Sequence, residues 1–153
     1  MSWPIICNDP KCSKKTIVRN IDELIKHHRD KDGWFVCPCG HRGHIPREFP
    51  TQEGGAWKPY LRGIIPLGEK EEIYQPFVFL VSGKPKGRAN DIWFSYYKDL
   101  RKRTKAGKRG RLKLGYGPGG PPVLNRYGLL DLLYHLVRVG VFSKRQVQRN
   151  ALS

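Results

Sequence analysis

The chain has 153 residues, of which 39% are hydrophobic, and it contains 17 glycines and 12 prolines. The length suits one compact domain or a small module attached to a larger one, and the low apolar content argues against a single large core. Lysine and arginine number 29 against 13 acidic residues, which gives a net charge of +16. The N-terminus lacks signal-peptide features, and the apolar run 77–81 is too short to cross a bilayer. We therefore expect a cytoplasmic protein with no membrane partner.

The first predicted elements are a turn, a strand and a helix. Residues 7–12 contain Asn, Asp and Pro between two cysteines, which predicts a tight turn. Residues 16–19 form a strand candidate. Asn20 and Glu23 then have the spacing of a capping box, and the apolar spacing that follows predicts a short helix to about Arg29.

The second pair of cysteines follows a second strand candidate. Residues 34–36, Trp-Phe-Val, are predicted to lead into the turn Cys37-Pro-Cys-Gly40. Two facing turns would offer four thiolates at the corners of a tetrahedron, which is the ligand set of structural zinc. Because protein ligands fill all four positions, no water site is left for catalysis. The predicted ligands are Cys7, Cys12, Cys37 and Cys39.

This pattern resembles a zinc ribbon, in which a strand leads into Cys-Pro-x-Cys-Gly. Here the second turn is one residue shorter, and a helix lies between the two cysteine pairs. The resemblance covers about residues 5–47 and implies a structural Zn²⁺. His41 and His44 follow closely, so a set of three cysteines and one histidine stays open. A redox-active pair, Cys37 and Cys39, is the other interpretation of the thiols.

The chain beyond residue 50 is expected to be rich in strands. Residues 51–55 read as a linker, which predicts a division into a zinc-ribbon-like module, 1–50, and a basic α+β region, 51–153. Strands are predicted over 60–65 and, most clearly, over 72–82, which is aromatic and β-branched. Pro76 argues against a central position for the first part of that second strand.

The following region combines one element that suits either a strand or a helix with one irregular segment. Residues 92–97 are typical of a buried strand, although they also suit the start of a short helix ending near Arg103. The aromatic side chains there suit either a core or base stacking beside a basic groove. Residues 115–122 are rich in glycine and proline, which excludes regular structure.

The C-terminal part is predicted to form two helices. Asn125 is a suitable cap for the first, and Gly140 stands where a glycine would end it. Ser143 and Gln146 form a second capping box, which begins a short basic helix to about Ala151. The predicted apolar stripe of the first helix comprises Leu129, Leu132, Leu133, Leu136 and Val137.

The strongest indication of function is a basic segment, residues 101–113, in which eight of thirteen residues are cationic and none is acidic. Counterion release would favour bringing these side chains to a phosphate backbone, so they predict nucleic-acid binding. A solvated basic loop without specific contacts is the alternative. The candidate contacts are Arg101, Lys102, Arg103, Lys105, Lys108, Arg109, Arg111 and Lys113.

The two C-terminal helices are similar to a helix-turn-helix, whose second helix would enter the major groove of DNA. Lys144, Arg145 and Arg149 are then further candidate contacts, with Gln146 and Gln148 beside them. A helical hairpin packed on the sheet explains the same pattern equally well.

Taken together, the sequence predicts an α+β protein: a small zinc-ribbon-like N-terminal module with an inserted helix, a small β-rich region and a C-terminal helical pair. We expect a non-catalytic nucleic-acid-binding protein with a structural Zn²⁺ and DNA or RNA as partner, for which a regulatory role is one option. One alternative is a metal-dependent nuclease, because His27-His28 with Asp30 and Asp32 resembles HNH-type endonucleases. The other is a subunit that binds a protein partner within a nucleoprotein assembly.

Overall fold

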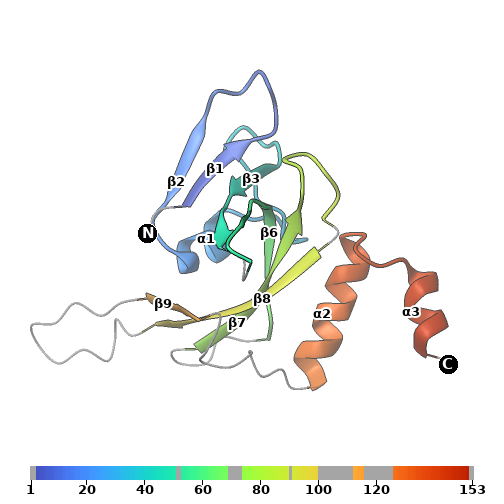
Figure 1. Ribbon diagram of the computed structural model, residues 1–153. Coiled ribbons are helices and arrows are strands. Elements are labelled where there is room, and N and C mark those ends of the chain that lie inside the picture. Colours follow the sequence, from blue (N-terminus) through green and yellow to red (C-terminus); the bar gives the residue numbers. More distant parts are fainter. Residues whose placement is uncertain are drawn as a thin grey trace, which may run out of the picture.

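The computed structural model describes residues 3–50, 53–68, 74–89, 91–99, 112–115 and 126–151. Over these ranges the chain is a mixed α/β structure with a central antiparallel sheet (Figure 1). Its elements are β1 (Trp3–Cys7), β2 (Lys15–Val18), α1 (Ile21–His27), β3 (Gly43–Pro46), β4 (Phe49–Pro50), β5 (Ala56–Trp57), β6 (Tyr60–Pro66), β7 (Tyr74–Ser82), β8 (Asp91–Asp99), β9 (Leu112–Gly115), α2 (Arg126–Arg138) and α3 (Lys144–Ala151).

The central sheet has seven strands within the described ranges, in the order β2-β1-β3-β6-β7-β8-β9. Every neighbouring pair is antiparallel, and the two-stranded ladder β4-β5 stands apart from it. From β6 onward, neighbours in the sheet are also neighbours in the sequence. β3, which follows α1, joins this meander to β1 and β2. The first cysteine turn begins at the end of β1 and the second lies just before β3, so the two turns stand beside adjacent strands.

Both faces of the sheet are covered, as the central strand β7 shows. Its side chains alternate between two cores because successive residues of a strand point to opposite faces. Phe77, Phe79 and Val81 belong to the core that includes α1, whereas Val78 and Leu80 belong to the core under α2. The structure is therefore layered, with α1 on one face and α2 on the other.

Both predicted cap residues are present, and the box at Ser143 is reciprocal, whereas at Asn20 the returning hydrogen bond starts from the preceding residue. Asn20 Oδ1 accepts from the Glu23 N–H at 2.9 Å, and Glu23 in turn accepts from the N–H of Arg19. At the start of α3, Ser143 and Gln146 exchange side-chain-to-backbone hydrogen bonds of 3.2 and 2.8 Å. These caps satisfy N–H groups that have no partner inside the helix.

Helix α2 ends at the predicted glycine but buries a narrower stripe than expected. Gly140 has φ +77, a conformation that favours glycine, and the Val141 N–H reaches back to the Leu136 carbonyl. Leu132 and Leu136 are buried, whereas Leu129 is 47% exposed. The predicted cap Asn125 lies outside the described residues.

Two strand predictions are refined. Residues 34–36 do not form a regular strand, because Trp34, Phe35 and Val36 each form an isolated bridge to a different segment. Pro76 lies opposite Tyr96 of β8, and on its other side its carbonyl accepts from the N–H of Leu67, the residue after β6, at 2.9 Å, so the proline stands between two bonded neighbours. The division at residue 50 stays a prediction, although the sheet includes strands from both sides of it.

Candidate metal centre

The first cysteine turn is held by its own backbone. Cys7 is the last residue of β1, and the Asp9 N–H donates to its sulfur at 3.4 Å. The Cys12 N–H donates to the Asp9 carbonyl at 3.0 Å, and the Asp9 carboxylate accepts from the Lys11 N–H. This Asp-Pro turn brings Cys12 back toward Cys7, as expected of Asx-type turn chemistry.

The second turn is equally compact. The Gly40 N–H donates to the Cys37 carbonyl at 2.8 Å, and the Cys37 N–H donates to the His41 carbonyl at 2.8 Å. Gly40 has φ +88, which a side chain would strain. Cys37 and Cys39 are separated by Pro38 alone, and the segment nevertheless forms a turn that directs both thiols toward the first cysteine turn.

The two turns are fixed side by side by strand pairing. Cys7 lies opposite Gly43 in the β1–β3 ladder, and the Asn8 N–H donates to the Arg42 carbonyl at 3.0 Å. A Cβ on Gly43 would stand 2.7 Å from the Ile5 side chain and 2.9 Å from the Ile6 carbonyl oxygen. The strands that carry the turns therefore approach more closely than any other residue at 43 would allow.

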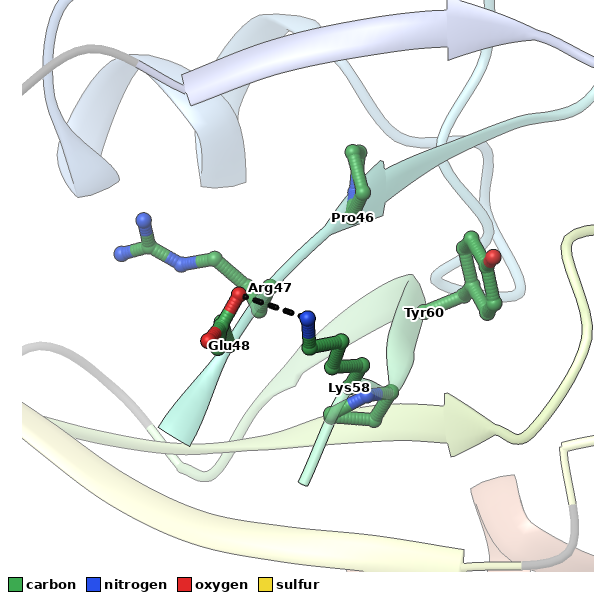
Figure 2. Close-up of a pocket in the computed structure, with 6 residues that line it drawn as sticks. Pro46, Arg47, Glu48, Lys58 and Tyr60 are labelled. Carbon is green, nitrogen blue, oxygen red and sulfur yellow. Dashed lines mark ion pairs between the residues drawn. The ribbon is translucent and has the colours of Figure 1, made fainter. Parts of the chain in front are cut away.

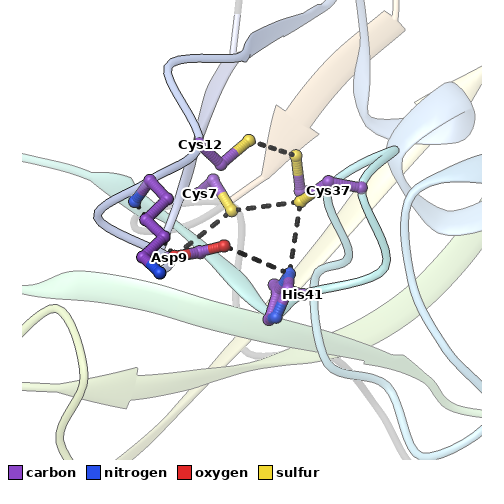
Figure 3. A network of polar contacts seen from close by, with 7 residues as sticks. Cys7, Asp9, Cys12, Cys37 and His41 are labelled. Carbon is purple, nitrogen blue, oxygen red and sulfur yellow. Dashed lines mark hydrogen bonds and ion pairs between the residues drawn. The ribbon is translucent and has the colours of Figure 1, made fainter.

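The four cysteine sulfurs meet in one cluster, as Figure 3 shows for the labelled thiols. Cys7 Sγ lies 3.4 Å from Cys39 Sγ, Cys12 Sγ lies 3.8 Å from Cys37 Sγ, and all four lie within 4.8 Å of one another. Four sulfurs at ~2.3 Å from a tetrahedral centre would stand about 3.8 Å apart. The cysteines, all unpaired by disulfides, are thus spaced to hold one metal ion.

Burial and hydrogen bonding act in opposite directions on the thiols. Burial raises the pKa of Cys7 from 9.0 to about 12, and it also raises the pKa of Cys37. Hydrogen bonds from the backbone and imidazole of His41 lower the pKa of Cys39 to about 6. Because a cation favours the thiolate form, binding of a metal would displace protons, including those of Cys7 and Cys37.

His41 and His44, the two histidines that follow the second cysteine pair, are not members of the cysteine cluster. His41 Nδ1 lies 3.5 Å from Cys39 Sγ and 3.6 Å from an Asp9 carboxylate oxygen, and both neighbours raise its pKa. His44 is buried, and its Nδ1 lies 2.6 Å from Asn8 Oδ1. Among the described residues, the group whose ligand atoms lie close enough together to bind one metal ion consists of the four cysteines.

The side chains behind the nuclease alternative have other contacts. Asp30 Oδ1 accepts from the backbone N–H groups of Asp32 and Trp34, which shapes the turn after α1. Asp32 forms an ion pair with Arg138 of α2 at 2.6 Å. His28 lies 3.7 Å from a carboxylate oxygen of Glu23, on the same helix.

The predicted nucleic-acid contacts are only partly described. Residues 101–111 lie outside the described residues, as do the side chains of Lys113 in β9 and Arg149 in α3. Lys144 and Arg145 are exposed in the first turn of α3. Of the aromatic residues that precede the basic segment, Tyr97 is 1% exposed and belongs to the core, whereas Phe94 is 38% exposed.

Among the described residues, two hollows outside the cysteine cluster are of interest. The larger, about 450 Å³, is lined by residues of β3, β6 and the segments beside them, and Glu48 pairs with Lys58 across it at 3.4 Å (Figure 2). Its remaining cation, Arg47, lies over the Trp3 ring at 4.0 Å. The smaller hollow is lined by four cationic residues that the sequence did not single out: Arg42, Arg62, Lys86 and Arg88. Their only sequence signal is the Lys-rich run 84–88, since Arg42 and Arg62 stand alone.

Comparison of the chain with protein-family models, curated proteins and solved structures returned no match. None of the described helices is both long and apolar enough to span a bilayer.

Proposed function

We propose that the chain is a non-catalytic nucleic-acid-binding protein stabilised by a structural Zn²⁺ bound to Cys7, Cys12, Cys37 and Cys39. Soft thiolates in a tetrahedral set favour zinc, and iron is the other metal that accepts four such ligands. The sulfur separations of 3.4 and 3.8 Å support a single small ion. With four protein ligands, the metal would link the two turns and leave no position for substrate.

The observation that carries the nucleic-acid proposal is the uneven charge. Residues 1–67 have 11 basic and 7 acidic side chains, whereas residues 68–153 have 18 and 6. A positive field of this kind attracts polyanions, and release of counterions from phosphates would reward the contact. Asp99 of β8 lies opposite Leu112 of β9. The chain that contains most of the basic segment thus leaves the sheet from β8 and returns to it at the neighbouring strand β9.

The test is a binding assay with single-stranded and duplex DNA and RNA over a range of salt concentrations. The charge variant replaces Arg101, Lys102, Arg103, Lys108 and Arg109 with Gln. We expect its affinity to fall sharply and its salt slope to flatten by ~0.9 per lost contact on duplex DNA.

A matched control removes the same number of charges from exposed positions in the first third of the chain. It replaces Lys11, Lys14, Lys15, Arg19 and Lys31 with Gln. Equal losses of affinity in the two variants would mean that only total charge matters. Unchanged binding in the first variant would remove the main support for the proposal.

An exposed apolar surface gives some support to the second candidate, a subunit with a protein partner. Leu129, Leu130 and Tyr134 on α2 are 47%, 62% and 58% exposed. Apolar side chains grouped in this way are typical of contact surfaces. A direct binder would reach full affinity for nucleic acid alone, whereas a subunit would require its partner. The nuclease alternative instead predicts cleavage dependent on Mg²⁺ or Mn²⁺ and lost in His28→Ala.

A further inference from the structure

The smaller hollow, which we call the basic cleft, lies where five separate segments meet. It has a volume of about 300 Å³. One wall comes from the turn after α1 and the start of β3, and another from β6. The loop after β7 and the end of α2 complete it. The lining residues are Trp34, Arg42, Arg62, Lys86, Gly87, Arg88, Ala89, Val139 and Gly140.

Arg62 is the most unusual member of this lining. It is only 4% exposed, and its one described hydrogen bond joins Nη1 to the Gly87 carbonyl at 2.6 Å. Its Nε–H has no acceptor among the described residues. A buried guanidinium whose donors are not all satisfied costs free energy, so such groups are normally paired with an anion.

A second guanidinium shares the same aromatic ring. Arg42 lies 4.5 Å and Arg62 5.8 Å from the centre of the Trp34 ring. Attraction to the ring's π face partly stabilises both cations. Their mutual repulsion opposes this, and together with burial it lowers the pKa of Arg62.

No carboxylate of the described residues offsets this charge. The described lining of the cleft contains no acidic residue. Over the described ranges, the ion pairs include none with Arg42, Arg62, Lys86 or Arg88. The neighbouring Arg138, in contrast, is paired with Asp32. Lys86 and Arg88 are exposed at the mouth, so a ligand can reach them from solvent.

We propose that the basic cleft binds a phosphate group, with Arg62 at its base and Arg42, Lys86 and Arg88 around it. Guanidinium groups match the geometry of phosphate oxygens, and several donors converging on one anion give a defined position rather than diffuse attraction. This inference rests on the proposed function, because the phosphate that we assign to the cleft is one of a bound nucleic-acid backbone. A free phosphate ion has the same chemistry, and the experiment below distinguishes it from a nucleic-acid phosphate.

The experiment uses Trp34 as the reporter in NMR spectra of the zinc-loaded, nitrogen-labelled protein. The four tryptophans give four indole N–H signals, and Trp34→Phe identifies the one from the cleft. Sodium phosphate is titrated against sodium chloride at equal ionic strength, followed by a short oligonucleotide. We expect phosphate and the oligonucleotide, but not chloride, to shift the Trp34 signal.

The binding measurement compares two triple variants. Arg42→Gln/Lys86→Gln/Arg88→Gln keeps the buried Arg62 and changes only exposed residues, so it should fold. The control, Lys14→Gln/Lys15→Gln/Arg19→Gln, removes equal charge near the β2 edge. We expect the cleft variant to lose about tenfold or more in oligonucleotide affinity relative to this control, since hydrogen bonds to charged groups are the strong ones.

The outcomes separate the two proposals. A protein that binds the oligonucleotide equally well in both variants, with a silent Trp34 signal, overturns the cleft and leaves the proposed function standing. A Trp34 response to phosphate without any oligonucleotide binding supports a cleft for free phosphate and overturns the proposed function. A silent Trp34 signal with both ligands, together with no measurable oligonucleotide binding, overturns both.

Discussion

The hydroxyl of Tyr97, on β8, donates a hydrogen bond of 2.9 Å to a carboxylate oxygen of Asp22, on α1. Both residues are buried, and the other carboxylate oxygen of Asp22 lies 3.1 Å from Lys26 Nζ. The contact joins the helix between the two cysteine pairs to a strand 75 residues away. It thus couples the metal-bearing part of the chain to the strand that precedes the basic segment.

Tyr97→Phe is expected to destabilise the protein by about 1–3 kcal/mol, because it leaves a buried carboxylate with one donor fewer. Tyr96→Phe is the matched control, since that ring lies on the other face of β8 and is partly exposed. Denaturant unfolding of the zinc-loaded proteins measures both. Equal midpoints for the two variants would show that the hydrogen bond contributes little.

Contacts between distant residues, such as this one, differ from the features that the sequence can predict, which depend on residues close together in the chain. Helix starts depend on residues three positions apart, and therefore the capping boxes at Asn20 and Ser143 could be read directly. Each cysteine pair likewise lies within a few residues of sequence, so both pairs could be identified without the fold. The strands over 60–65 and 72–82 follow from their composition, and both occur as β6 and β7.

Features that depend on distant segments could not be predicted. Arg42 and Arg62 are single basic residues in the sequence, and only the fold places both against Trp34. Residues 34–36 have a strand-like composition, yet their bridges go to three different segments because the turn after α1 bends there. Neither the placement of the two arginines nor the irregular bridges can be predicted from the neighbouring residues in the sequence.

Metal removal should unfold the first part of the chain. The four buried or half-buried thiols form no disulfide. Without a cation, the close packing of their sulfurs therefore adds little to the stability of the fold. We expect one zinc per chain and, after chelation, a loss of several kcal/mol in stability or of folding itself. Metal analysis and thermal unfolding measure this, with zinc-saturated chelator as the control. A fully folded, equally stable zinc-free protein would contradict the structural role.

Cys39 should be the most reactive cysteine in any zinc-free protein that keeps the native turns. Its pKa of about 6 makes it largely thiolate at neutral pH, whereas Cys7, near 12, stays protonated. Alkylation followed by mass spectrometry should show the Cys39 rate rising as the pH increases through about 6.

His41→Ala tests the cause of that reactivity. Removing the imidazole hydrogen bond should move the Cys39 profile upward toward the ordinary 9.0, while zinc binding to the four thiols is retained. Four cysteines with one shared profile in the unsubstituted protein would mean that the turns are lost without metal.

The approach of β1 to β3 gives the most direct test of how the cysteine turns are held together. Gly43 lies opposite Cys7, and a methyl group there would meet Ile5 and the Ile6 carbonyl oxygen below 3.0 Å. Gly43→Ala should therefore separate the strands, lower stability by about 1–3 kcal/mol and weaken zinc binding.

Gly83→Ala is the matched control for that substitution, because nothing lies within 4 Å of a Cβ at residue 83. We expect it to leave both stability and zinc affinity close to those of the original protein. Unfolding curves and competition with a zinc chelator measure the two quantities separately. If Gly43→Ala lowers stability but not zinc affinity, the turns keep their relative position without the close approach of β1 to β3, and the metal itself then sets that position.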